Sequence, residues 1–163
     1  MNVMDVTNPQ TYPLSATVRV NASAEAVFAA ATDWERQGEW MTATSVRPTA
    51  LNGQAVGGGI AAFTGIGPIG FVDTMVITAW DPPRRCSVRH TGRVVRGTGD
   101  FIVEPVTAGT SDFIWAEQVI VPFGRLGAAT WPLARPAAQA ILTLSLRRFA
   151  HWAERRATET RGQ

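Results

Sequence analysis

The sequence predicts an α+β fold in which an antiparallel sheet of six to seven strands curves around a long C-terminal helix. Two observations carry this prediction. Between residues 45 and 121 the chain reads as six consecutive strands separated by turns, with no helix among them. After Pro132 and Pro136 the sequence changes to a helical period, with its apolar residues on one face. A meandering sheet followed by one amphipathic helix is expected to bury that helix face on the concave side of the sheet.

The N-terminal part supplies a first strand and two short helices. Over residues 14–20 apolar side chains alternate with polar ones, which is typical of a half-buried strand. Ser23 is a favourable N-cap for a helix over residues 24–32. Residues 33–41 are predicted to form a second short helix or turn, broken near Gly38. Both short helices then lie between the first and second strands.

The remaining elements follow in order along the chain. Strands are expected at residues 45–51, 59–64, 71–80, 84–91, 94–106 and 111–121. Turns between the later strands are predicted at Asp81-Pro82-Pro83, Gly92-Arg93 and Ala108-Gly109. The C-terminal helix is expected over residues 137–159. Residues 1–11 and 159–163 are expected to be flexible tails on a single domain over residues 12–158.

Alternation along paired strands predicts which side chains face the interior, because neighbouring residues of a strand point to opposite faces. In the strand over residues 84–91, Arg85, Ser87 and Arg89 alternate with Cys86, Val88 and His90. The phase with the two arginines is expected to face water, so the phase that contains His90 is expected to face inward. The opposite pairs expected across the proline turn are Met75 with His90, Ile77 with Val88, and Ala79 with Cys86. Those expected across Gly92-Arg93 are His90 with Val95, Val88 with Gly97, and Cys86 with Gly99. The resulting inward set is Phe71, Asp73, Met75, Cys86, Val88, His90, Val95, Gly97, Gly99, Phe101, Val103, Phe113, Trp115 and Glu117.

Two features of this inward set point to a cavity that holds a ligand. Gly97 and Gly99 leave volume unfilled where a packed core would carry large side chains. Asp73, His90 and Glu117 share the phase of apolar residues, and buried ionisable groups are costly unless they are paired, hydrated or functional. They are therefore the candidate catalytic residues, with His90 as acid or base, Asp73 orienting it and Glu117 binding or polarising a substrate. The alternative is a structural histidine that is hydrogen-bonded inside a polar-lined pocket.

The residues expected to bind the ligand combine inward positions with nearby aromatic side chains. Trp40 and Trp131 are expected at the rim of the pocket. The full set is Trp40, Phe63, Phe71, Asp73, Met75, His90, Gly97, Gly99, Phe101, Trp115, Glu117 and Trp131.

The composition excludes several kinds of chemistry. All fifteen basic residues are arginine, so no lysine is available for Schiff-base or P-loop chemistry. The net charge of only +2 does not favour a nucleic-acid partner. Cys86 is the single cysteine and the two histidines are far apart in sequence, so neither a disulfide nor a Cys/His metal site is expected. We therefore expect no metal and no other cofactor.

Two further patterns bear on ligand and location. Residues 65–70 match G-x-G-x-x-G, but Pro68 removes an amide donor and a strand follows instead of a helix. A mobile hairpin loop at the cavity mouth is therefore expected in place of a dinucleotide site.

The sequence shows no signal peptide and no transmembrane segment, so we expect a cytoplasmic protein.

Five segments resemble the SRPBCC superfamily of START-like helix-grip proteins, and most closely its bacterial polyketide cyclase/dehydrase-like branch. They are residues 21–28, Asp33-Trp34 with Glu39-Trp40-Met41, residues 79–85, residues 109–115 and residues 146–150. The resemblance extends over about residues 13–157. It implies a helix-grip fold with a cavity for an apolar ligand, as in lipid carriers, hormone receptors, co-chaperones and aromatase/cyclases.

Three functions follow as expectations. The first is binding of a hydrophobic or aromatic small molecule, lipid-like or polyketide-like, between the sheet and the C-terminal helix. The second is a polyketide cyclase/aromatase or dehydratase that uses the same pocket. The third is a START-like protein–protein interaction module. A hydrophobic ligand is the expected partner, nucleic acid is not, and the protein is expected to be a monomer or a homodimer.

Overall fold

The computed structural model describes residues 10–121 and 123–161, and it confirms the predicted α+β architecture. The elements are β1 (Thr11–Val20), α1 (Ala24–Ala31), η1 (Trp34–Glu39), β2 (Thr44–Ala50), η2 (Leu51–Gly53), β3 (Gly59–Ile66), β4 (Ile69–Asp81), β5 (Arg85–His90), β6 (Gly97–Thr107), β7 (Thr110–Ile120) and α2 (Gly124–Arg161). Of the two flexible tails that the sequence predicts, residues 1–9 and 162–163 lie outside the described residues.

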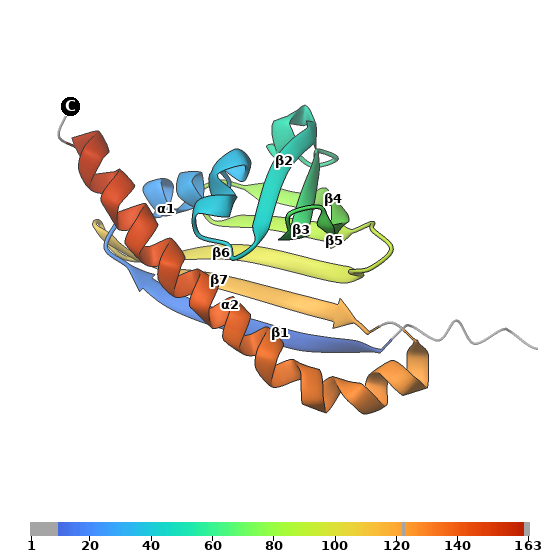
Figure 1. Cartoon of the computed structure of the whole chain (residues 1–163). Coiled ribbons are helices and arrows are strands. Elements are labelled where there is room, and N and C mark those ends of the chain that lie inside the picture. Colours follow the sequence, from blue (N-terminus) through green and yellow to red (C-terminus); the bar gives the residue numbers. More distant parts are fainter. Residues whose placement is uncertain (1–9, 122, 162–163) are drawn as a thin grey trace, which may run out of the picture.

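The sheet has seven antiparallel strands in the order β1-β7-β6-β5-β4-β3-β2. The chain passes from β1 at one edge to β2 at the other through α1 and η1. Figure 1 shows α2 running obliquely across one side of the sheet, with α1 and η1 beside its C-terminal part. The concave side of the sheet therefore faces α2 and η1. The cavity described below lies on this side.

Local sequence accounts for the first helix and for the β3–β4 hairpin. The Ser23 side chain accepts a hydrogen bond from the Ala26 amide at 3.3 Å, which caps α1 as expected. The G-x-G-x-x-G segment forms the tip of the hairpin, where Ile66 pairs with Ile69. Gly67 has a φ of +57°, a conformation that glycine adopts without steric cost. The hairpin interpretation of this motif is therefore correct.

Helix α2 begins earlier than the sequence predicts. It starts at Gly124, and both Pro132 and Pro136 lie inside it, although we expected them to precede the helix. Proline is costly inside a helix because it lacks the amide donor and clashes with the preceding turn. The helix bends in the part that contains the prolines (Figure 1), as is common at proline. No helix within the described ranges is long and apolar enough to cross a membrane.

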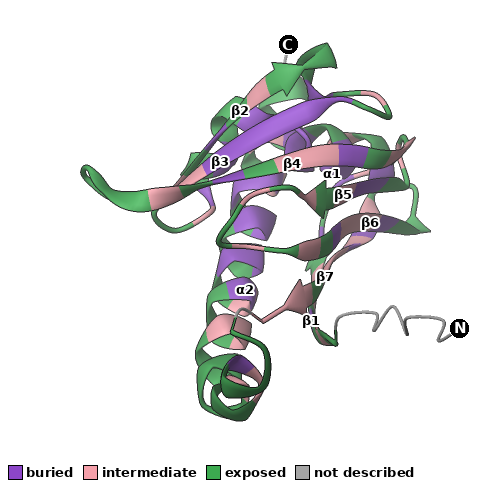
Figure 2. Cartoon of the chain, turned by 90° about the vertical axis from the view of Figure 1, so that its right-hand side faces the viewer, coloured by how far each residue is buried: buried purple, intermediate pink, exposed green. Residues whose placement is uncertain are grey.

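The core lies where the C-terminal part of α2 crosses the sheet. Phe149 is fully buried, and its ring centroid lies 4.4 Å from that of Phe113 and 5.0 Å from that of Trp40. Leu146 and Trp152 are also buried. Figure 2 shows the buried positions of α2 facing the sheet and a largely exposed N-terminal part of the helix. The half of α2 after the prolines therefore supplies most of its buried contacts.

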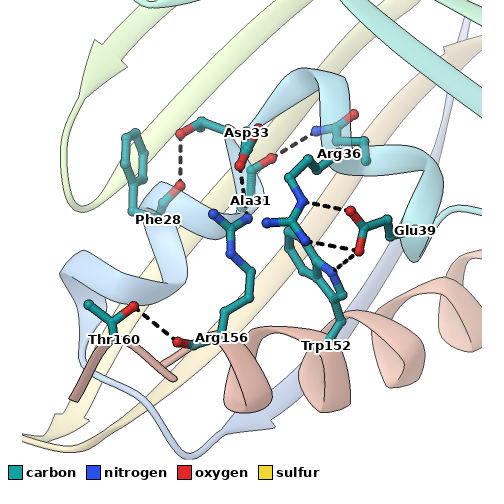
Figure 3. Close-up of polar contacts among 10 residues, drawn as sticks. Phe28, Ala31, Asp33, Arg36, Glu39, Trp152, Arg156 and Thr160 are labelled. Carbon is teal, nitrogen blue, oxygen red and sulfur yellow. Dashed lines mark hydrogen bonds and ion pairs between the residues drawn. The ribbon is translucent and has the colours of Figure 1, made fainter. Parts of the chain in front are cut away.

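A polar network attaches η1 to α2 (Figure 3). The Trp152 indole lies between two guanidinium groups, with Arg156 at 4.6 Å and Arg36 at 5.5 Å from the ring centroid. Its Nε1 donates to Glu39 Oε2 at 2.7 Å, and Arg36 donates to the same carboxylate at 2.6 Å. Arg156 donates to Asp33 at 2.8 Å. These contacts fix η1, which forms one end of the cavity described below.

The strand register differs from the prediction at two places. Met75 pairs with His90, and Ile77 with Val88, as predicted. A bulge after Ile77 then places Ala79 opposite Ser87 and Trp80 opposite Cys86, so the predicted pair of Ala79 with Cys86 is wrong.

Between β5 and β6 the predicted register is wrong by two residues. His90 lies opposite Gly97, Val88 opposite Gly99 and Cys86 opposite Phe101. The connection occupies residues 91–96, which is longer than the two-residue turn that we assumed. Because the error is an even number of residues, the side chains predicted to share a face still share it.

Candidate functional site

A cavity of about 480 Å³ lies between the concave face of the sheet and α2. Its wall is mostly apolar. The lining residues are Trp34, Gln37, Met41, Thr42, Ala43, Thr44, Val46, Ile60, Ala62, Thr64, Asp73, Met75, Cys86, Val88, His90, Val95, Gly99, Asp100, Phe101, Trp115, Glu117, Val119, Ile141 and Ser145. They come from η1, six strands, two connecting segments and α2.

Asp73, His90, Glu117 and Trp115 form one chain of hydrogen bonds on the cavity wall. The distance from His90 Nδ1 to Asp73 Oδ2 is 2.6 Å, and that from His90 Nε2 to Glu117 Oε2 is 3.2 Å. Trp115 Nε1 donates to Glu117 Oε1 at 2.7 Å. The three ionisable groups therefore come from β4, β5 and β7, and both nitrogens of the imidazole face a carboxylate.

Gly99 leaves room for these hydrogen bonds to pass over β6, the strand that separates β5 from β7. Val88 lies opposite Gly99 on β6, and Gly99 lies opposite Glu117 on β7. A Cβ atom at position 99 would lie 2.8 Å from Glu117 Oε1. The absence of a side chain on Gly99 therefore leaves room for the carboxylate that meets His90.

The two carboxylates favour the protonated form of His90. Burial lowers its pKa, but the hydrogen bonds to Asp73 and Glu117 outweigh burial, and the pKa rises to about 9. The side chains of His90 and Asp73 are 7% and 8% exposed, whereas that of Glu117 is 16% exposed. Among these three ionisable side chains, Glu117 is therefore the most accessible.

Two further polar groups lie in the site: the second carboxylate oxygen of Asp73 and the thiol of Cys86. Asp73 Oδ1 is buried and has no hydrogen-bond partner among the described residues. The Cys86 thiol also lines the cavity, and burial raises its pKa to about 12. Cys86 is therefore a neutral thiol that adds to the apolar part of the wall.

The structure brings many of the residues that we expected to bind a ligand to the same cavity, and places others elsewhere. Those that line it are Asp73, Met75, His90, Gly99, Phe101, Trp115 and Glu117. Phe63, Phe71 and Gly97 are not part of the lining. Trp40 is fully buried in the core, and Trp131 packs against Tyr12 with ring centroids 5.5 Å apart. Neither tryptophan is at the rim, where the sequence placed it.

The residues of β2, β3, η1 and α2 that line the cavity were not among those predicted from the sequence. Pairing across the β3–β4 hairpin places Ile60 opposite Met75 and Ala62 opposite Asp73. The same alternation that found Asp73 could therefore have found these two residues. Trp34 and Ser145 reach the cavity through packing of η1 and α2, which alternation along strands does not predict.

A curved antiparallel sheet around a long helix, with a cavity between them, defines the helix-grip class of proteins. The family model described as polyketide cyclase / dehydrase and lipid transport matches residues 13–154. The chain belongs to this family, which confirms the resemblance seen in the sequence.

Several solved structures share the fold. The Zhui aromatase/cyclase from Streptomyces sp. R1128 has a TM-score of 0.74 at 14% identity, over 90% of this chain and 95% of that one. The di-domain ARO/CYC StfQ from the steffimycin biosynthetic pathway has a TM-score of 0.69 at 12% identity, over 91% of this chain and 52% of that one. A norcoclaurine synthase point mutant from Thalictrum flavum has a TM-score of 0.60 at 13% identity, over 89% and 98%. No curated protein sequence matches significantly.

Proposed function

We propose that this protein binds a largely apolar or aromatic small molecule in the cavity between the sheet and α2. The observation that carries the proposal is the cavity itself. Its volume of about 480 Å³ lies in the range of roughly 300–1,000 Å³ that ligand pockets occupy. A mostly apolar wall that also carries a smaller number of polar groups is typical of such pockets. Membership of the polyketide cyclase / dehydrase and lipid transport family supports this proposal.

Binding of the neutral dye Nile red tests the proposal, because its fluorescence rises in an apolar environment. Val88 lines the cavity, so Val88→Phe is expected to fill part of it and weaken dye binding by about tenfold or more. Val72 is 54% exposed, and Val72→Phe makes the same chemical change outside the cavity. We expect this control to bind the dye as the wild type does. A dye that does not bind, or binds equally well to Val88→Phe, contradicts the proposal.

A second candidate function is a cyclase/aromatase or dehydratase that uses the same pocket. The chain from Asp73 through His90 to Glu117 favours it, because a buried imidazolium beside a cavity is a proton donor. In a dehydration, a carboxylate removes a proton from the carbon beside a carbonyl while an imidazolium protonates the departing hydroxyl. A carbon–carbon double bond forms and water leaves.

In this second candidate we propose a separate role for each of the three groups. Glu117 is the most accessible of the three side chains, so it would contact the substrate. His90 would supply the proton, and Asp73 would hold the imidazolium in place from Nδ1. Both ring nitrogens face carboxylates, so Glu117 must move or relay the proton before His90 can reach a substrate.

A further inference from the structure

The ionisable side chains that face the cavity carry more negative than positive charge. We infer that the ligand of this cavity carries a cationic nitrogen, a protonated amine or quaternary ammonium, on an apolar skeleton. This inference rests on the proposed function, since it requires that the cavity binds a small molecule.

None of the described residues that line the cavity is an arginine, and the sequence has no lysine. The carboxylate of Asp100 is bound to Arg85 at 2.8 Å and to Ser87 at 2.5 Å, so it is already paired. Arg148 donates to Thr42 at the edge of the cavity at 2.9 Å, but it is not part of the lining. The wall thus retains two carboxylates, Asp73 and Glu117, with His90 between them.

The formal charges of these three groups sum to a net negative charge. When His90 is an imidazolium, two carboxylates and one cation give a net charge of −1. A net charge in a mostly apolar cavity is costly unless an opposite charge compensates it. A ligand cation would make the site neutral.

Glu117 is placed to receive such a cation. It is the most exposed of the three groups, at 16%. Each of its oxygens accepts one hydrogen bond in the chain, from Trp115 and from His90, and a carboxylate oxygen can accept a second. A ligand N–H donor can therefore bind Glu117 without breaking the contacts that hold it.

Aromatic side chains on the same wall also favour a cation. Trp115 and Phe101 both line the cavity and pack edge to face, with ring centroids 5.4 Å apart. Trp34 lies next to Phe101, with centroids 6.4 Å apart. The negative faces of aromatic rings attract ammonium groups, and aromatic walls beside a carboxylate recognise quaternary ammonium ligands. An anionic ligand would instead meet the like charge of the two carboxylates, which disfavours carboxylic acids.

The test uses three probes with one naphthalene skeleton and different charges: 2-(2-naphthyl)ethylamine, 2-(2-naphthyl)ethanol and 2-naphthylacetate. Isothermal titration calorimetry at pH 7 measures their affinities for the full chain. We expect the amine to bind about tenfold more tightly than the alcohol, and the acetate to bind most weakly. We expect Glu117→Gln to remove most of the preference for the amine over the alcohol. Glu104→Gln makes the same change at an exposed position of β6 and should retain the preference.

Each outcome decides between the two proposals. If the alcohol or the acetate binds as tightly as the amine to the wild type, the charge inference is overturned while small-molecule binding stands. An amine preference that survives in a folded Glu117→Gln variant also overturns it. If none of the three probes binds and Nile red does not bind either, both proposals are overturned. The wild-type comparison requires no variant, so the test remains decisive if Glu117→Gln does not fold.

Discussion

His90 Nε2 lies 3.2 Å from Glu117 Oε2, although these residues belong to strands that are not neighbours in the sheet. Strand β6 separates β5 from β7, and Gly99 is the β6 residue opposite Glu117. An ordinary side chain at this position would occupy the space that the Glu117 carboxylate takes. One glycine on the middle strand therefore makes possible the charged chain on the cavity wall.

Substituting Gly99 should displace Glu117 from His90. In Gly99→Ala the new methyl group would lie 2.8 Å from Glu117 Oε1, and the flexible carboxylate has to move away. Losing one of its two carboxylate partners should lower the pKa of His90 from about 9 toward its ordinary value. NMR titration of the imidazole measures this change. Gly109→Ala is the control, because a Cβ atom there meets nothing within 4 Å. An unchanged pKa in Gly99→Ala would show that Gly99 does not position Glu117.

The stability of the fold should depend on pH through His90. The pKa of His90 is about 9 in the folded protein and about 6.5 in an unfolded chain, so it is raised on folding. A raised pKa stabilises the fold fully below the unfolded value and loses this effect as the pH rises through 9. We therefore expect the wild type to lose about 3 kcal/mol relative to His90→Gln between pH 6 and pH 10. Urea unfolding at the two pH values measures this difference, and an equal difference at both contradicts the assigned pKa.

Packing of α2 against the sheet should account for much of the stability. Leu146 is 1% exposed, so Leu146→Ala should lower the free energy of unfolding by roughly 2–5 kcal/mol. Leu144 is 53% exposed, and Leu144→Ala should change it by only about 0.5 kcal/mol. Thermal or urea unfolding of both variants provides the measurement. Similar losses in the two variants would mean that α2 presents a different face to the core.

Catalysis, the second candidate function, has its own test. The β-hydroxy ketone 4-hydroxy-4-(2-naphthyl)butan-2-one yields a conjugated enone when it loses water, and the enone absorbs in the near ultraviolet. If the protein is a dehydratase, His90→Gln should slow this reaction by about 100-fold or more, because general acid–base groups contribute roughly 10²–10⁴. His151→Gln, at an exposed histidine of α2, should retain the rate. No acceleration by the wild type would count against a dehydratase acting on this kind of substrate.

The alternation of inward-facing and outward-facing residues along the strands predicted the site. It placed Asp73, His90 and Glu117 on one face, and these side chains do form one hydrogen-bonded chain. This worked even though the β5–β6 register was wrong, because an error of two residues preserves the face. Whether these residues bind a ligand remains a prediction.

Other parts of the fold depend on contacts that local sequence rules do not contain. Pro132 and Pro136 predicted a boundary, yet α2 continues through both. Trp40 was expected at the rim of the pocket because it is aromatic and lies in a short helical region. It packs instead in the core against Phe149. Likewise, Trp34 lines the cavity from η1, which the hydrogen bond between Trp152 and Glu39 attaches to α2. These outcomes are set by tertiary packing between segments that are distant in the chain.

Intermolecular nuclear Overhauser effects can show whether a small molecule binds inside the cavity. The measurement uses methyl-labelled protein with bound Nile red. Met75 and Val88 line the cavity, whereas Ile66 and Leu133 are more than 80% exposed on the outside. We predict contacts from the dye to the methyl groups of Met75 and Val88. Contacts only to Ile66, Leu133 or other exposed methyl groups would place the ligand on the surface and contradict binding inside the cavity.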